Sequence, residues 1–145
     1  MATRSTIAME QPDGRVMQVY CHWDGYIDNN GKILQEHYQD NAKVLALMLL
    51  GDISSLRAEI GMAHSFDARY EDTDPRNEWV VAYGRDRGED GTDTKVWANF
   101  DDYVANHQYE EYEYIYRTDG KWYVAAYNDQ YKLLAEEIEA LPVEG

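Results

Sequence analysis

The sequence predicts an α+β fold: a single domain spanning residues 1–145, with an antiparallel sheet built from hairpins and three or four packed helices. Three observations predict this fold. Asp119-Gly120 separates two alternating runs, and Asp-Gly is the short-range signature of a two-residue type I′ hairpin turn. Pro12-Asp13-Gly14 separates two earlier runs, whereas Ala42–Leu50 is a strong helix former. Strands in hairpins, together with separate helices, favour an antiparallel sheet covered by helices.

Alternation, turn residues and helix caps set the order of the elements. Asp40 or Asn41 suits the N-cap of the Ala42–Leu50 helix, and Asn99 and Asp129 suit the N-caps of two later helices. In chain order we expect strands at Ser5–Glu10 and Arg15–Trp23, a polar loop at 24–31, helices at 32–38 and 42–50, a turn at 52–56, a strand at Glu78–Tyr83, a loop at 84–93, a strand at Thr94–Ala98, a helix at 100–107, a hairpin at 109–127 and a helix at 130–141.

A two-residue turn at Asp119-Gly120 sets the expected register of the last hairpin, pairing Tyr116 with Tyr123 and Ile115 with Val124. Because side chains alternate between the faces of a strand, most tyrosines are then expected on one face and the aliphatic residues on the other. The tyrosine face would hold Tyr112, Tyr114, Tyr116, Tyr123 and Tyr127, and the core face Ile115, Trp122, Val124 and Ala126.

Carboxylates border these tyrosines, and the combination is typical of a binding surface rather than of a catalytic site. We call this predicted surface the acidic tyrosine face. It comprises Asp101, Asp102, Tyr109, Glu110, Glu111, Tyr112, Glu113 and Tyr114. A single-strand-binding platform needs a positively charged groove, so these carboxylates argue against stacked nucleic acid bases as its ligand.

The composition gives a formal net charge of −15, from 13 basic and 28 acidic residues. This charge disfavours direct binding to nucleic acid or to an anionic membrane, and it favours basic proteins as partners. The single cysteine, Cys21, excludes an intrachain disulfide and fits a reducing compartment. No apolar run is long enough to span a bilayer, so we expect a protein of the cytoplasm, in a host cell.

The densest cluster of reactive residue types lies between Cys21 and Tyr26. If the strand continues through Trp23, Cys21 and His22 point to opposite faces and do not form a nucleophile–base pair. Two interpretations stay open: a strand-ending turn with aromatic core residues, or a ligand pocket. The pocket would be lined by His22, Trp23, Asp24, Tyr26 and His37. No spacing matches a common metal site, and we assign no catalytic residue, metal or cofactor.

The run Tyr20-Cys-His-Trp-Asp-Gly-Tyr26, followed by Asn30-Gly31, His37-Tyr38 and 50–56, resembles small acidic proteins of bacteriophages and prophages. The resemblance covers about the first sixty residues. It implies a phage context but no catalytic residues, because that family carries no activity to transfer. In size and charge alone, the chain also resembles antirestriction proteins that mimic DNA.

These observations lead to three functional hypotheses. The leading one is a non-enzymatic phage accessory protein whose acidic tyrosine face occupies a basic nucleic-acid-binding site on a host protein, with carboxylates in place of phosphates. The second is a small-ligand or nucleotide-binding protein, or an enzyme, with its pocket around Cys21 to Tyr26. The third is a structural component that forms a homodimer or larger homo-oligomer through the tyrosine face.

Overall fold

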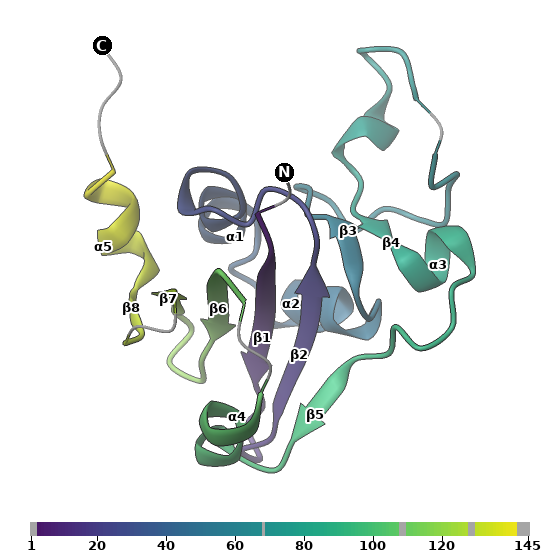
Figure 1. Cartoon of the computed structure of the whole chain (residues 1–145). Coiled ribbons are helices and arrows are strands. Elements are labelled where there is room, and N and C mark those ends of the chain that lie inside the picture. The colour runs from purple at the N-terminus through teal and green to yellow at the C-terminus, as the bar shows by residue number, and fades with distance from the viewer. Residues whose placement is uncertain (1–2, 68, 108–109, 128–129, 142–145) are drawn as a thin grey trace.

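A computed structural model describes residues 3–67, 69–107, 110–127 and 130–141, and it has the α+β fold that the sequence predicts (Figure 1). The described residues form an 8-stranded sheet with α-helices packed against it. The strands are β1 (Ser5–Glu10), β2 (Val16–Cys21), β3 (Ile53–Ser55), β4 (Val81–Ala82), β5 (Lys95–Trp97), β6 (Tyr112–Tyr116), β7 (Trp122–Ala126) and β8 (Lys132–Leu133). The α-helices are α1 (Lys32–His37), α2 (Asn41–Leu49), α3 (Tyr83–Arg87), α4 (Phe100–Asn106) and α5 (Leu134–Glu139). A π-helical turn, Ile27–Gly31, leads into α1, and a 3-10 helix covers Pro75–Glu78.

The sheet is mixed rather than purely antiparallel. Its strand order is β4-β3-β2-β1-β6-β7-β8, and β5 pairs with β2 beside this path. The first hairpin, β1–β2, and the last, β6–β7, are antiparallel as expected, but β1 and β6 join them side by side in parallel. Strand β1 therefore lies in the middle of the sheet, between β2 of its own hairpin and β6 of the last hairpin (Figure 1).

Two short strands share the outer edge of β2. β3 pairs with it at Cys21, and β5 pairs with it over Val16–Gln18. Between these pairings, the backbone N–H of Tyr20 donates to the carboxylate of Asp52 at 2.9 Å. A side chain thus replaces the strand partner at this point of the edge, which satisfies a backbone donor that would otherwise be left unpaired.

The two faces of the sheet are packed differently. The main core lies on the face covered by α1, α2 and α5, and it contains Ile7, Met9, Val19, Leu34, Val44, Leu47, Met48, Trp122, Val124 and Leu134. A smaller cluster lies on the opposite face, where α4 and Trp97 pack on Ala8, Val16 and Ile115. The second face is therefore only partly covered by apolar packing.

Several local predictions are confirmed. The first hairpin forms around Gly14, whose φ of +94° suits the turn. Asp40 is the N-cap of α2 and accepts a hydrogen bond from the N–H of Ala42 at 3.1 Å. Asn99 is the N-cap of α4 and accepts from the N–H of Asp102 at 2.7 Å. These caps are local in sequence, which is why composition and spacing identify them.

Other local predictions are wrong, because distant contacts decide the backbone. The segment expected as a turn at 52–56 contains β3. Of the strand expected at Glu78–Tyr83, only Val81–Ala82 forms a strand, β4. The chain then turns into α3, because the carboxylate of Asp86 accepts a hydrogen bond from the N–H of Ala82 at 2.8 Å. The last helix begins at Leu134, after β8, and its predicted N-cap, Asp129, lies outside the described residues.

The register of the last hairpin differs from the prediction by one residue. Tyr116 pairs with Trp122 instead of Tyr123, and Arg117 bonds Lys121 across a three-residue loop. The carboxylate of Glu10 on β1 binds both Arg117 and Thr118, so the neighbouring strand holds the start of the loop. A one-residue shift moves one strand's side chains to the other face. The tyrosines of β6 consequently share the core-facing side with Trp122 and Val124, and Tyr123 lies on the opposite side.

Candidate functional site

The predicted acidic tyrosine face does not form a continuous surface. The shift in register buries Tyr114 in the main core, where its hydroxyl donates to the carbonyl of Gly25 at 2.6 Å. Glu113 points to the other face and is 1% exposed. Tyr112 is half-buried, and Tyr109 lies outside the described residues. Glu113 and Tyr114 are thus unable to meet a partner in the folded protein.

Glu113 belongs to a buried hydrogen-bond network beneath α4. Its carboxylate bonds the Nε2 atom of His107 and accepts from the hydroxyl of Tyr131 at 3.3 Å. The ring of His107 stacks on Tyr103, with 4.1 Å between the centroids. A buried carboxylate needs such partners, so this acidic residue has a structural explanation.

The remaining acids of the predicted face have separate environments. Asp101 is exposed on α4, whereas the carboxylate of Asp102 accepts from the N–H of Ala98 and from the side chain of Asn106. Glu111 is half-buried and accepts from the backbone N–H of Arg4 at 3.4 Å. Glu110 instead lines a cavity on the sheet, which we describe below.

The Cys21–Tyr26 segment ends β2 and closes it over the start of β1. Cys21 is fully buried, and burial raises the pKa of its thiol to about 11, so the thiol is protonated at neutral pH. The N–H of Gly25 donates to the carbonyl of Thr3 at 2.8 Å, and a Cβ at Gly25 would meet the side chain of Ser5 at 2.7 Å. The glycine is needed for this close approach of two chain segments.

The side chains proposed for the alternative pocket line neither of the two cavities described below, although the rings of His22 and Trp23 contact each other with 4.7 Å between their centroids. His22 is hydrogen-bonded to the hydroxyl of Tyr20 at 2.8 Å, while Trp23, Asp24, Tyr26 and His37 are exposed. Within the described ranges, no three His, Cys, Asp or Glu side chains are grouped so that they could hold a metal ion.

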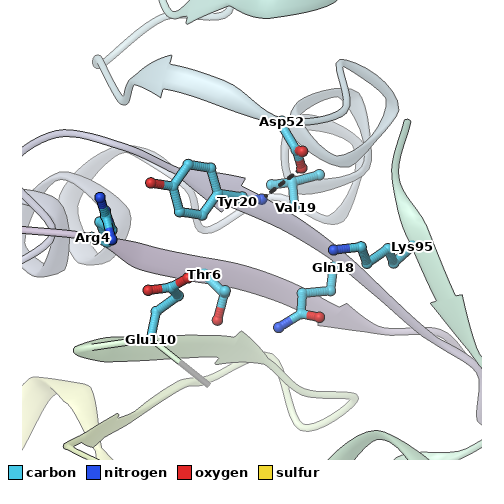
Figure 2. A pocket seen from close by; sticks show the side chains of 8 residues that line it. All are labelled: Arg4, Thr6, Gln18, Val19, Tyr20, Asp52, Lys95 and Glu110. Carbon is cyan, nitrogen blue, oxygen red and sulfur yellow. Dashed lines mark hydrogen bonds between the residues drawn. The ribbon is translucent and has the colours of Figure 1, made fainter. Parts of the chain in front are cut away.

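A cavity of about 320 Å³ lies close to this segment, on the face of the sheet that α4 only partly covers (Figure 2). Its side chains come from β1 and β2, from the two segments along the outer edge of β2, and from the residues before β6. It is lined by Arg4, Thr6, Gln18, Val19, Tyr20, Asp52, Lys95 and Glu110. The volume is at the lower end of the roughly 300–1,000 Å³ that ligand pockets occupy.

Two buried side chains of the cavity each have a polar atom without a hydrogen-bond partner among the described residues. Thr6 is 4% exposed and Gln18 is 2% exposed. Neither the Oγ1 atom of Thr6 nor the Nε2 atom of Gln18 has a partner among the residues that the structure describes. Among the described residues, these are the two buried side-chain polar atoms that lack a hydrogen-bond partner, and both residues line the same cavity.

The orientation of the Gln18 amide follows from its neighbour Trp97. The indole N–H of Trp97 donates to the Oε1 atom of Gln18 at 3.4 Å. Because an indole nitrogen only donates, the oxygen of the amide must face it, and the NH₂ group is a double donor with no acceptor in the described part of the chain. The Gln18 amide is therefore prepared to donate to an acceptor atom of a ligand.

Charges of both signs surround these polar groups. Arg4 and Glu110 lie at one end of the cavity in Figure 2, and Lys95 and Asp52 at the other. Burial raises the pKa of Asp52, and Lys95 partly offsets this effect. Burial also raises the pKa of Glu110, with Arg4 acting in the opposite direction. The lining thus provides two half-buried carboxylates, on Asp52 and Glu110, and two exposed cations, on Arg4 and Lys95.

A second hollow, of about 610 Å³, lies between α2 and the turn that joins β1 to β2. Its polar groups include Glu10, whose carboxylate is already bonded to Arg117 and Thr118. Neither of the two unpaired buried atoms belongs to this hollow. The smaller cavity on the sheet is the better candidate because two of its buried polar atoms, Thr6 Oγ1 and Gln18 Nε2, have no hydrogen-bond partner among the described residues.

The sequence prediction missed most residues of the cavity. Thr6 and Gln18 are polar residues within otherwise largely apolar strands, and the antiparallel register places their side chains on the same face. That pattern was a usable signal, since a polar residue on a covered face needs a partner. Asp52 and Lys95 carry no comparable signal, because their place depends on how β3 and β5 divide the edge of β2.

The fold and cavity define an α+β domain with a polar, half-enclosed site on one face of a mixed sheet. No protein-family model, curated protein or solved structure matches this chain significantly. In the part of the chain that the structure describes, no helix has the length and apolar character needed to cross a membrane.

Proposed function

We propose that the protein reversibly binds a small polar ligand in the cavity on the sheet. The observation that carries this proposal is the pair of buried polar atoms, Thr6 Oγ1 and Gln18 Nε2, for which the described residues provide no hydrogen-bond partner. Leaving such a group unpaired costs about 1–3 kcal/mol. A ligand that accepts a hydrogen bond from Gln18 and bonds the hydroxyl of Thr6 removes this cost, and the free energy of binding includes that gain.

The proposal is one of binding rather than of a reaction. The lining supplies hydrogen-bond donors, carboxylate acceptors and the ring of Tyr20, which are the features of a recognition site. The thiol of Cys21 is buried and protonated, which argues against nucleophilic catalysis by that residue. The site differs from the pocket predicted at Cys21 to Tyr26, but it adjoins that segment through Tyr20 and His22.

The test is a ligand screen on the full chain, using thermal shift and then NMR titration with amino acids, nucleosides, sugars and small carboxylic acids. We expect hits to perturb the resonances of Thr6 and Gln18, and Thr6→Val and Gln18→Met to weaken binding by at least about tenfold each, the loss of one good hydrogen bond. Thr118→Val is the matched control, because that hydroxyl bonds Glu10 in the second hollow. Hits that bind both cavity variants with unchanged affinity would refute the proposal.

A second candidate function is inhibition of a host protein with a basic surface, and the net charge of −15 supports it. Asp101 and Glu111 are its best remaining contacts, since Glu113 and Tyr114 are buried. This function predicts that a pull-down from bacterial lysate recovers a nucleic-acid-handling protein that salt releases. Capture that survives the double change Asp101→Asn and Glu111→Gln would exclude it, and Thr6→Val should leave such capture unchanged.

A further inference from the structure

Three aromatic side chains lead from the cavity to the surface of the protein. Gln18 and Tyr20 lie two positions apart on β2, so both side chains are on the face that carries the cavity. Beyond the end of β2, the Nδ1 atom of His22 is hydrogen-bonded to the hydroxyl of Tyr20 at 2.8 Å. The ring of Trp23 stands edge-on to that of His22, with 4.7 Å between the centroids, and Trp23 is 43% exposed. We call Tyr20, His22 and Trp23 the aromatic strip; it joins the polar cavity to an exposed indole.

The buried part of the cavity requires a hydrogen-bond acceptor from its ligand. The NH₂ group of Gln18 is turned toward Thr6 in Figure 2, and neither this nitrogen nor the Oγ1 atom of Thr6 has a partner among the described residues. An ammonium group cannot accept a hydrogen bond, so it does not satisfy Gln18. A hydroxyl group does, because its oxygen accepts from the amide while its proton is donated to the Oγ1 atom of Thr6. One ligand hydroxyl therefore pairs both groups.

The charges at the cavity disfavour an anionic acceptor. Asp52 and Glu110 are half-buried, whereas Arg4 and Lys95 are exposed. Water screens the exposed cations more than the half-buried carboxylates, so an anion that enters the cavity is repelled, in a protein of net charge −15. Both carboxylates already interact within the protein: Asp52 accepts from the N–H of Tyr20, and Arg4 opposes the rise that burial causes in the pKa of Glu110. The acceptor that the ligand supplies is therefore a neutral group.

We propose, on the basis of the proposed function, that the cavity and the aromatic strip together bind a neutral saccharide. Its terminal sugar lies in the cavity, with one hydroxyl group between Gln18 and Thr6, and the next sugar packs its C–H face on Trp23. A saccharide repeats these two features along its length, because each unit has hydroxyl groups at its edge and an apolar face. The volume of about 320 Å³ is small for a ligand pocket, so one sugar unit lies inside and the rest of the chain follows the strip.

This arrangement predicts that the length and the charge of the sugar have separate effects. Glucose, mannose and galactose each test the cavity, and their neutral trisaccharides test the aromatic strip as well. We expect at least one of these monosaccharides to bind, and its trisaccharide to bind at least about tenfold more tightly, the usual effect of a tryptophan anchor. The uronic acid of that monosaccharide should bind at least about tenfold more weakly than the neutral form, because its carboxylate is repelled by Asp52 and Glu110.

The experiment is NMR titration of the full chain with these sugars, followed by titration of variants. Uracil and triproline are included because they combine an apolar ring with carbonyl acceptors and have no hydroxyl group. Trp23→Ala should remove the gain of the trisaccharide and leave the affinity for the monosaccharide unchanged, since Trp23 does not line the cavity. Gln18→Met should weaken the binding of both by at least about tenfold. Leu49→Ala is the matched control and should change neither, because Leu49 is an exposed apolar residue on α2, which covers the other face of the sheet.

The contrary results separate this inference from the proposed function. If none of the sugars binds, the inference is wrong, and binding of uracil or triproline through Gln18 would then leave the cavity as a binding site of another class. If the trisaccharide gains nothing, or if its gain survives in Trp23→Ala, the aromatic strip is not part of the site and the inference fails while the cavity still binds its ligand. If a sugar binds with unchanged affinity to both Gln18→Met and Trp23→Ala, it is held elsewhere, and both the inference and the proposed function fail for this cavity.

Discussion

Replacing Thr6 by valine should stabilise the free protein while it weakens ligand binding. The change substitutes a methyl group for a hydroxyl of similar size at a position that is 4% exposed. The hydroxyl has no partner among the described residues, so the folded protein loses no hydrogen bond and is relieved of an unsatisfied polar group. Valine also suits the middle of a strand. We take the lower end of the usual cost of about 1–3 kcal/mol for such a group, because the cavity opens to solvent nearby.

A gain of about 1 kcal/mol in the free energy of unfolding corresponds to a rise of roughly 2–4 °C in Tm for a domain near this size. It also raises the urea midpoint by about 0.5 M if the m-value is about 2 kcal/mol/M. Tryptophan fluorescence reports the transition, since Trp122 is buried in the core.

Thr94→Val is the control for this prediction, because the hydroxyl of Thr94 donates to the carbonyl of Met48. The same substitution there should cost about 1 kcal/mol, the net value of a typical hydrogen bond. The reasoning would be refuted if Thr6→Val lowered stability as much as Thr94→Val does. That result would mean that the Thr6 hydroxyl already has a partner in the free protein.

Three further predictions concern the buried and paired groups. Glu113→Gln should lower the free energy of unfolding by about 2–4 kcal/mol in urea denaturation, because it breaks a buried pair with His107. Cys21 should resist alkylation at about pH 8 in the native protein and react once urea unfolds it, since the thiol is buried with a raised pKa. When the pH is lowered from about 6 to about 3, the free energy of unfolding, measured by urea denaturation, should fall less for the Glu10→Gln variant than for the wild-type protein. Burial alone would raise the pKa of Glu10, but the hydrogen bonds from Arg117 and Thr118 outweigh this effect and lower the pKa below 4.5. The ionised carboxylate therefore stabilises the folded protein above that value, and this stabilisation is lost as the pH falls through the lowered pKa.

Each of these predictions has a control and a contrary result. Glu139→Gln, on the exposed side of α5, should leave stability unchanged, and an equally small effect at Glu113 would contradict its buried pairing. Alkylation of native Cys21 at the rate of the unfolded chain would show that the thiol is accessible. Equal acid sensitivity with and without the Glu10 carboxylate would mean that its pairing with Arg117 adds nothing to stability.

The parts of the fold that the sequence predicted depend on neighbouring residues. The turn at Gly14 and the helix caps Asp40 and Asn99 are set within a few positions, so spacing alone identified them. The register of the last hairpin was missed because Glu10, on another strand, holds the start of its loop. Local turn signals do not reveal such a contact.

The candidate site was harder to predict because no short segment contains it. Thr6 and Gln18 meet through strand pairing, and Asp52, Lys95 and Glu110 reach them from three further parts of the chain. Charge and tyrosine content directed the prediction to residues around 101–114, where tertiary packing then buried two of the most informative ones, Glu113 and Tyr114. Periodicity indicates that a face is buried, but it does not say which neighbour covers that face.

The parallel pairing of β1 with β6 determines the order in which the strands of the sheet can pair while the protein is synthesised. Ser5 pairs with Tyr112, and Arg117 reaches back 107 residues to Glu10. On the ribosome, β1 and β2 emerge before β6 and can form their hairpin while one edge of β1 has no strand beside it. That edge is completed only after β6 has been synthesised, about a hundred residues later, and contacts of such long range form slowly. The central strand therefore depends on protection from wrong partners during the interval, and a chain that stops before β6 would keep an open strand edge of the kind that leads to aggregation.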